Sequence, residues 1–270
     1  MSAPGMVTSR ASAAVRALRA PAPPLSGEET VRDTFEVIIL TGRPAAGKSE
    51  VIDYLKKTPV EERRRRFHIG EFEEIDDFPM IWERFEDEAI YEKYGKPRVY
   101  TTPDNYFKEH FFWNFLIEKM NLVFEKKLAA DPKYTEHTTT IIEFARGGEN
   151  ALAEAFGYLS DNILARAGIV YIDVSYEESV RKNRRRFRPD QAHSILYHSL
   201  PDEKMEHYYK VNDWHQIARG QEGFIPVKKH SVPFAVLPNE PEQTDDPGKL
   251  GPALEDVFGR LWRTRVATPA

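Results

Sequence analysis

The sequence predicts an α/β fold: a doubly wound, parallel sheet of about five strands with helices on both faces, plus a helical lid. Three observations support this prediction. From residue 34 onward, short apolar runs alternate with segments of helical periodicity. Each run is apolar enough to be buried on both faces, as strands of parallel sheets are. A glycine-containing loop, Gly42–Ser49, stands between the first strand and the first helix.

The strands are expected where apolar runs are bounded by polar or turn residues, at 35–41, 66–70, 138–144, 169–174 and 233–237. The helices are expected where apolar residues recur at spacings of three and four, at 50–57, 80–94, 103–128, 150–166, 175–186, 201–214 and 252–265. In the first helix Val51, Ile52 and Leu55 share one face, and Pro59 follows its end. Ser175 is a suitable N-cap for the fifth helix.

The chain divides into a tail and a main domain. Residues 1–30 are rich in Ala, Ser and Pro, and the segment before Glu28 contains arginines but no acid. Two interpretations stay open: a disordered tail, or an organellar transit peptide covering residues 1–27. The main domain is expected over 31–270, with a polar lid or insertion at about 181–230.

Composition narrows the possible functions. The 270 residues are 41% hydrophobic, enough to bury a sizeable core, and carry a net charge of −5. This charge favours neither nucleic acid nor an anionic membrane as a partner, and no apolar stretch approaches the roughly 20 residues that span a bilayer. The absence of cysteine excludes disulfides, thiolate metal sites and a cysteine nucleophile, and fits a cytoplasmic protein.

The loop Gly42-Arg43-Pro44-Ala45-Ala46-Gly47-Lys48-Ser49 fits the phosphate-binding pattern Gly-x-x-x-x-Gly-Lys-Ser/Thr. A strand before the pattern and a helix after it are the context that this motif requires. Its glycines allow successive N–H groups to surround phosphate oxygens, and the helix dipole adds positive potential. Lys48 can reach the β- and γ-phosphates, and the Ser49 hydroxyl can ligate Mg²⁺. All eight residues are therefore predicted to bind a nucleotide.

The third predicted strand ends near Glu143 and Arg146. Ligands of open α/β sheets bind outside the carboxyl ends of the strands. A carboxylate there can hold the hydration shell of Mg²⁺, and Arg146 can reach a phosphate or the substrate. The alternative is an ion pair on the surface.

Arginines cluster where the fifth helix ends. Arg181, Arg184, Arg185 and Arg188 recur at spacings that place them on one helical face. We interpret this face as a lid that neutralises phosphate charge, and the alternative is a solvated helix end. The run Arg63–Arg66 is interpreted as a solvated loop.

An acidic segment follows the second predicted strand, and one of its carboxylates is a candidate general base. Glu71 is nearest the predicted strand end and is the first choice, followed by Asp76 or Asp77. The histidines of the 190–230 excursion, His193, His198 and His207, lack a clear ligand spacing and are interpreted as surface residues of the lid.

In its order of motifs the chain resembles the P-loop kinases of small molecules, nearest the nucleoside and nucleotide kinases, over about residues 34–265. The resemblance implies Glu71 as the base, Glu143 and Arg146 as the Glu-Arg pair after the third strand, and lid arginines at Arg181, Arg184, Arg185 and Arg188. It also implies ATP and Mg²⁺ as cofactors, with adenine against residues 238–241. Two residues separate Glu143 from Arg146, whereas the pair is adjacent in deoxynucleoside kinases.

The expected function is ATP- and Mg²⁺-dependent phosphoryl transfer to a small molecule, most favourably a nucleoside or nucleotide. Lys48, Glu71, Glu143, Arg146 and Arg185 are the expected catalytic residues, with Ser49 and Glu143 at the metal. A sugar or an antibiotic is the alternative acceptor. A nucleotide switch with a protein partner is the rival function, although the sequence lacks the Asn-Lys-x-Asp guanine signature.

Overall fold

The computed structural model describes residues 32–186 and 199–267. The chain divides after Arg32, and all the described helices and strands lie in the unit Asp33–Ala270. The predicted tail, residues 1–30, lies outside the described residues.

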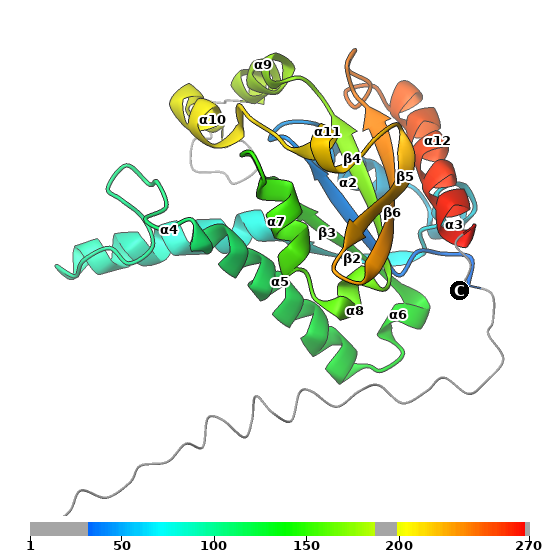
Figure 1. Ribbon diagram of the computed structural model, residues 1–270, viewed down its shortest axis with the longest axis horizontal. Coiled ribbons are helices and arrows are strands. Elements are labelled where there is room, and N and C mark those ends of the chain that lie inside the picture. The colour runs from blue at the N-terminus through cyan, green and yellow to red at the C-terminus, as the bar shows by residue number, and fades with distance from the viewer. Residues whose placement is uncertain (1–31, 187–198, 268–270) are drawn as a thin grey trace, which may run out of the picture. The chain divides into compact units, whose positions relative to one another are not determined.

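A six-stranded sheet with the order β2-β3-β1-β4-β6-β5 forms the centre of this unit (Figure 1). Its strands are β1 (Val37–Gly42), β2 (Glu71–Asp76), β3 (Thr138–Phe144), β4 (Ala167–Asp173), β5 (Glu222–Val227) and β6 (His230–Pro238). Four neighbouring pairs are parallel, and β5 runs antiparallel to β6 at the edge. The mostly parallel α/β sheet agrees with the predicted class.

Helices precede and follow these strands in chain order. They are α2 (Lys48–Lys57), α3 (Val60–Phe67), α4 (Asp77–Lys93), α5 (Phe111–Ala130), α6 (Tyr134–His137), α7 (Ala151–Tyr158), α8 (Asp161–Leu164), α9 (Tyr176–Arg186), α10 (Asp202–Tyr209), α11 (Trp214–Ile217) and α12 (Pro247–Val266). Within the described ranges, no helix combines the length and apolar character needed to cross a membrane.

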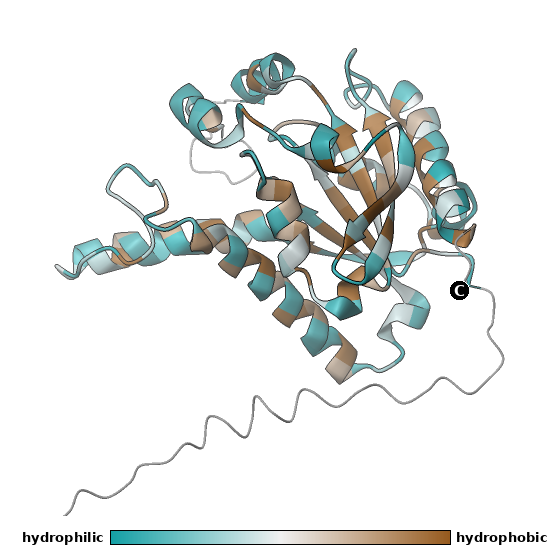
Figure 2. Ribbon diagram, in the orientation of Figure 1, coloured by the Kyte–Doolittle hydropathy of each residue, from teal (hydrophilic) through white to brown (hydrophobic). Residues whose placement is uncertain are grey.

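The sheet separates two hydrophobic cores, one on each face. Side chains of a strand point alternately to the two faces, so Val37 and Ile39 enter one core while Ile38 and Leu40 enter the other. Residues of α5, α7, α8 and α11 complete the first core, and residues of α2, α3 and α12 complete the second. Figure 2 shows the strands as predominantly hydrophobic between these helices.

The predicted second strand is wrong in position. Residues 66–67 end α3, which runs through the whole arginine cluster, so the predicted solvated loop at Arg63–Arg66 is also wrong. Arg63 is buried because its guanidinium donates hydrogen bonds to the carbonyl groups of Leu55, Thr58 and Gly70. The strand begins only at Glu71, and the acidic segment itself is β2.

The remaining differences lie at helix ends and in one unpredicted strand. The helix predicted from residue 103 begins at Phe111, and the 150–166 prediction divides into α7 and α8, with Ser160 as the N-cap of α8. The 201–214 prediction divides into α10 and α11. Strand β5 lies inside the predicted lid. It contains Pro226, which an edge strand accommodates.

Candidate functional site

The connections that follow β1 and β3 run in opposite directions across the sheet. After β1 it crosses to β2 at one edge, and after β3 it crosses to β4 on the other side of β1. Right-handed crossovers in opposite directions place their helices on opposite faces. The carboxyl ends of β1 and β3 therefore flank the place where open α/β sheets bind ligands, and we call this place the crevice.

The 42–49 loop closes one side of this crevice, between β1 and α2. Its backbone takes positive φ at Ala45 (54°) and Gly47 (120°). A Cβ atom at Gly47 would lie 2.7 Å from Thr244 Cγ2, so only glycine fits there. Within the described chain, no group accepts a hydrogen bond from the N–H groups of Gly47, Lys48 or Ser49. These donors at a helix N-terminus suit an anion.

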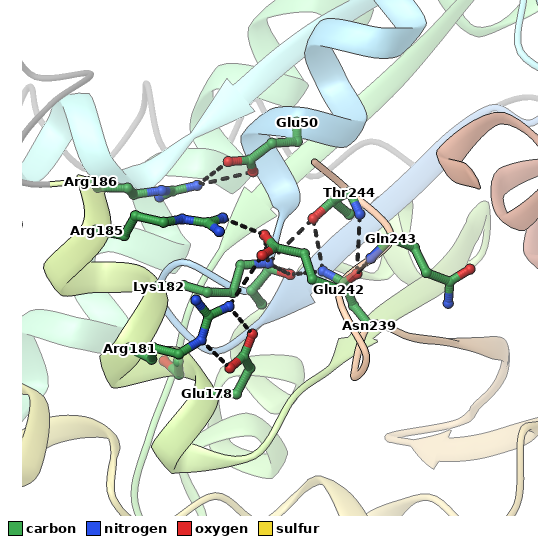
Figure 3. Close-up of polar contacts among 12 residues, drawn as sticks. Glu50, Glu178, Arg181, Lys182, Arg185, Arg186, Asn239, Glu242, Gln243 and Thr244 are labelled. Carbon is green, nitrogen blue, oxygen red and sulfur yellow. Dashed lines mark hydrogen bonds and ion pairs between the residues drawn. The ribbon is translucent and has the colours of Figure 1, made fainter. Parts of the chain in front are cut away.

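Groups from α9 and from the segment after β6 hold the outer side of the loop. The Asn239 side chain donates to the Ala46 carbonyl (2.7 Å) and to Thr244 Oγ1 (2.9 Å). Lys182, which is buried, lies 3.4 Å from the same carbonyl oxygen, and Ser179 donates to the Pro44 carbonyl (2.7 Å). The loop is therefore fixed by partners distant in sequence (Figure 3).

Lys48 points from the first turn of α2 toward the crevice. Its ammonium group is buried, donates to the Arg43 carbonyl (3.2 Å) and lies 4.0 Å from Glu143 Oε1. Burial lowers the pKa of Lys48, and the Glu143 charge opposes this shift. The ammonium group is thus a cation shielded from water and held against the backbone of the 42–49 loop. Ser49 is exposed at the same helix start.

Three carboxylates face the lysine from the other side of the crevice. Asp76 ends β2 directly beside Glu143 of β3, and Asp77 begins α4. Burial raises the pKa of Asp76 to about 8, with the charges of Glu143 and Asp77 adding to the shift. Burial also raises the pKa of Glu143, although Lys48 opposes it. This crowding of acids is electrostatically unfavourable without a cation.

These groups fit a magnesium nucleotide. The exposed Ser49 hydroxyl and the carboxylates of Glu143 and Asp76 are the hard oxygen donors that Mg²⁺ takes, and Mg²⁺ usually keeps waters and shares phosphate oxygens. Among the described residues, no group of three or more His, Cys, Asp and Glu is arranged to hold a metal by itself.

Arg146 lies just beyond β3 and is locked in place by several partners. Its guanidinium forms a close ion pair with Asp77 and donates to the Trp113 carbonyl (3.1 Å). It also lies over the Trp113 ring, 5.0 Å from the ring centroid. Arg146 is buried, and its Nε atom has no hydrogen-bond partner within the described part of the chain. This N–H is a buried donor left over for a ligand.

A pocket opens beside this arginine. It is lined by His110, Trp113, Asn114, Arg146, Gly147, Ala151, Glu154 and Tyr208. The first three come from the start of α5, the next four from the connection into α7, and the last from α10. Through Arg146 and Asp77 the pocket adjoins the crevice.

The predicted lid arginines that the structure describes do not all lie together. Arg181 and Arg185 pair with Glu242, which also binds Lys182 (Figure 3). Arg184 pairs with Asp202. Arg188, His193 and His198 lie outside the described residues.

Arg186 was not among the predicted site residues, yet its charge acts on the crevice. It donates to both carboxylate oxygens of Glu50 in the first turn of α2 (2.9 and 3.0 Å). The positive charge of Arg186 adds to the lowering of the Lys48 pKa and opposes the rise that burial causes in the Glu143 pKa. The basic run of the sequence contains Arg186, but Glu50, with which Arg186 pairs, lies 136 residues away in the chain.

The predicted placement of Glu71 is wrong. Glu71 is the first residue of β2 and not a residue beyond its end. It therefore lies at the amino end of the strand, whereas the crevice lies at the carboxyl ends. Its carboxylate is largely exposed and lies 3.6 Å from Arg63. Asp76, at the carboxyl end of the same strand, occupies the position expected for Glu71.

The comparisons with known proteins add little to this geometry. No family model and no curated protein matches the sequence. Two solved structures resemble the fold, each over 98% of its own chain. A protein named APE1195 has a TM-score of 0.38 and 14% identity over 84% of this chain. An unliganded sugar kinase from Janibacter sp. HTCC2649 has a TM-score of 0.39 and 12% identity over 86%. At these scores, inferences about function rest on the site's own residues.

Proposed function

We propose that this protein transfers the γ-phosphoryl group of ATP to a hydroxyl group of a small molecule, with Mg²⁺ as cofactor. One observation carries the proposal: the N–H groups of Gly47, Lys48 and Ser49, which have no acceptor in the described chain, lie at the same crevice as the Lys48 ammonium and the carboxylates of Asp76 and Glu143. Phosphoryl transfer depends on positioning and charge neutralisation of this kind.

The 42–49 loop and Lys48 are the groups that bind and orient the nucleotide phosphates. The loop backbone contributes N–H donors, and the buried ammonium contributes a charge whose field water screens weakly. Mg²⁺, held by Ser49 and Glu143 with Asp76 nearby, would neutralise charge on the phosphate oxygens.

Asp76 is the proposed general base in place of Glu71. The acceptor oxygen forms a bond to the γ-phosphorus while the bond from that phosphorus to the bridging oxygen of ADP breaks. The hydroxyl proton passes to the Asp76 carboxylate. A carboxylate with a raised pKa is a better proton acceptor than an ordinary aspartate.

Arg186 is the proposed arginine of the transfer step. Arg184 is held by Asp202, and Arg181 and Arg185 are held by Glu242 in the segment after β6, whereas Arg186 is held by Glu50 in the first turn of α2. A guanidinium there would stabilise charge developing on the transferred group. Arg146 is proposed to face the acceptor.

A nucleoside or nucleotide is the acceptor implied by the resemblance to P-loop kinases, and a sugar or antibiotic is the alternative. A switch that binds a nucleotide and a protein partner is the rival function. Asp76, at the carboxyl end of β2 beside Glu143, supplies a candidate general base, which phosphoryl transfer uses and a nucleotide switch does not require.

The test is transfer of ³²P from [γ-³²P]ATP and Mg²⁺ to panels of nucleosides, nucleoside monophosphates, sugars and aminoglycosides. Wild type should label an acceptor, and Lys48→Ala should lose about two to three orders of magnitude in kcat/KM. Lys57→Ala, at the exposed end of the same helix, is the matched control and should keep full activity. ATP binding without labelling of any acceptor would refute the kinase proposal and favour the switch.

A further inference from the structure

Two buried side chains of α9 contact carbonyl groups on the outer side of the 42–49 loop. Ser179 and Lys182 are three residues apart in the helix, so they share the face that lies against the loop. The Ser179 hydroxyl donates to the Pro44 carbonyl (2.7 Å), and the Lys182 ammonium nitrogen lies 3.4 Å from the Ala46 carbonyl oxygen. Lys182 is only 2% exposed, and a lysine is rarely buried so completely unless it has a specific partner. The position of this buried cation behind the loop therefore calls for a function.

The peptide unit between Ala46 and Gly47 connects Lys182 with the crevice. Its carbonyl oxygen accepts a hydrogen bond from Asn239 Nδ2 (2.7 Å) in addition to its contact with Lys182. Its N–H is one of the loop donors that have no acceptor within the described chain. Because a peptide unit is polarised as a whole, donors and cations at its oxygen make its N–H a stronger hydrogen-bond donor. Lys182 thus strengthens a donor group at the crevice that it does not itself contact.

The ion pairs around Lys182 do not cancel its charge. Glu242, in the segment after β6, lies 2.9 Å from Lys182 Nζ, and the same carboxylate pairs with Arg181 and Arg185 (Figure 3). Arg181 also pairs with Glu178, so that three cations share two carboxylates. Water screens the Lys182 charge weakly because the side chain is buried. The cluster behind the loop is therefore positive, which is the sign that favours a polyanion at the crevice.

We infer that Lys182 and Asn239 are positioning residues for the nucleotide phosphates: they hold the Ala46–Gly47 peptide and polarise it, so that its N–H binds a phosphate oxygen more strongly. A merely structural Lys182 would hold α9 against the loop without changing the strength of this donor. The inference rests on the proposed function in taking the 42–49 loop as the phosphate site, but it does not depend on phosphoryl transfer.

NMR of the full chain can observe this peptide directly, because the sequence contains only two Ala-Gly pairs, Ala46–Gly47 and Ala167–Gly168. Labelling of alanine carbonyls with ¹³C and of glycine with ¹⁵N therefore gives two linked signals. Gly168 lies in β4 and serves as the internal reference. Tripolyphosphate with Mg²⁺, a probe that lacks base and ribose, should move the Gly47 amide proton downfield in wild type, as a strong hydrogen bond does. The shift should be smaller in Lys182→Met, which keeps an unbranched side chain and removes the charge.

Calorimetric titration measures the consequence for affinity. Lys182→Met should bind tripolyphosphate about tenfold or more weakly than wild type, and ATP more weakly by the same factor, since both ligands contact the same N–H. Asn239→Ala removes the neutral donor from the same carbonyl and should weaken both ligands by a smaller factor. Lys228→Met is the matched control, because Lys228 also donates to a backbone carbonyl, that of Leu159 (2.6 Å), but in the turn between β5 and β6. Its affinities should equal those of wild type.

Thermal unfolding without ligand checks that each variant is folded, and Asn239→Ala takes the place of Lys182→Met in every comparison if the latter does not fold. Equal Gly47 shifts in wild type and variant, or an unchanged tripolyphosphate affinity, would overturn the inference. A loss of affinity for ATP but not for tripolyphosphate would also overturn it, because the defect would then lie at the base or ribose.

The failures of the two proposals are distinguishable. Transfer of label from ATP by wild type, with tripolyphosphate affinity unchanged in Lys182→Met, would overturn the inference and leave the kinase proposal intact. Weakened tripolyphosphate binding and a reduced Gly47 shift in Lys182→Met, with no transfer to any acceptor by wild type, would refute the kinase and leave the inference standing.

Discussion

At the scale of single residues, the crevice brings together three acids, of which Asp77 is paired with Arg146 and Glu143 lies 4.0 Å from Lys48. Asp76, Asp77 and Glu143 all have raised pKa values because burial disfavours their charged forms. Lys48, the facing cation, has a lowered pKa for the same reason. Such opposed shifts are typical of sites where a charged ligand or a proton is exchanged. A substitution that removes one of these charges should therefore raise stability and lower activity.

Asp76→Asn tests this conflict. The folded-state pKa of Asp76, about 8, is above the ordinary value of 3.8. The folded state therefore holds a proton that the unfolded state has lost, and stability contributed by Asp76 falls as pH rises from about 4 to 8. Asparagine keeps the N-cap bond from Phe78 N and removes this slope. At pH 8 the variant should unfold at least about 3–5 °C higher than wild type.

The same variant should lose at least about two orders of magnitude in kcat while still binding ATP. Thermal unfolding at pH 5 and pH 8, with rates at pH 8, provides both measurements. Glu71→Gln, on the same strand, is the control and should change neither. An equal pH dependence of unfolding in wild type and Asp76→Asn would contradict the assignment.

The variant Arg186→Ala tests whether Arg186, and not another arginine of α9, acts in phosphoryl transfer. Removal of the guanidinium beside Lys48 and Glu143 should lower kcat about 10²–10³-fold with a smaller change in ATP affinity. Arg184→Ala, two residues earlier and paired with Asp202, should keep kcat within about threefold. Steady-state kinetics of both variants make the comparison, and a larger loss in Arg184→Ala would reverse the assignment.

At the scale of elements, a buried carboxylate fixes the loop between α4 and α5. Glu88 on α4 is fully buried and accepts from the N–H groups of Val99 (2.9 Å), Tyr100 (2.6 Å) and Thr101 (2.8 Å). Burial alone would raise its pKa, but these donors outweigh it, so the pKa of Glu88 lies below its usual value. The loop continues to Phe107, which donates a hydrogen bond to Tyr208 at the pocket beside Arg146.

Glu88→Gln places an amide group opposite backbone N–H donors and should cost about 1–3 kcal/mol of unfolding free energy. Because the loop supports Tyr208, the KM for the acceptor should rise while the KM for ATP stays unchanged. Thermal unfolding, hydrogen exchange at residues 99–101 and the two KM values test this. Glu86→Gln, exposed on the same helix, is the control. Equal increases in both KM values would indicate a general loss of folding.

At the scale of the whole molecule, ligand binding should report on the two halves of the site separately. ATP with Mg²⁺ at about 100 times its dissociation constant should stabilise wild type by about 2.7 kcal/mol. Lys48→Ala should lose most of this gain, whereas Glu154→Gln should retain it. Thermal unfolding with increasing ATP measures it. Equal losses in the two variants would contradict the division into donor and acceptor sides.

The sequence predicted what depends on local pattern. The 42–49 loop, its flanking strand and helix, and Glu143 near the end of β3 are where the pattern placed them. The start of β2 was misplaced because a buried Arg63 turns a basic run into a helix, and its partners are carbonyl groups that no periodicity reveals. The pocket joins segments as distant as Arg146 and Tyr208, and Arg186 depends on Glu50, so neither could be predicted from spacing.

The two cores on opposite faces of the sheet have a consequence for how this protein can change over evolution. Helix α2, where we propose that the nucleotide phosphates bind, rests on one core, whereas α5 and α7, which supply most of the pocket beside Arg146, rest on the other. Substitutions that reshape the α5–α7 side leave the packing beneath α2 untouched. Acceptor preference can thus diversify among descendants of this chain while the nucleotide half is inherited unchanged. The strands β1, β3, β4 and β6 contribute side chains to both cores and so connect the two halves.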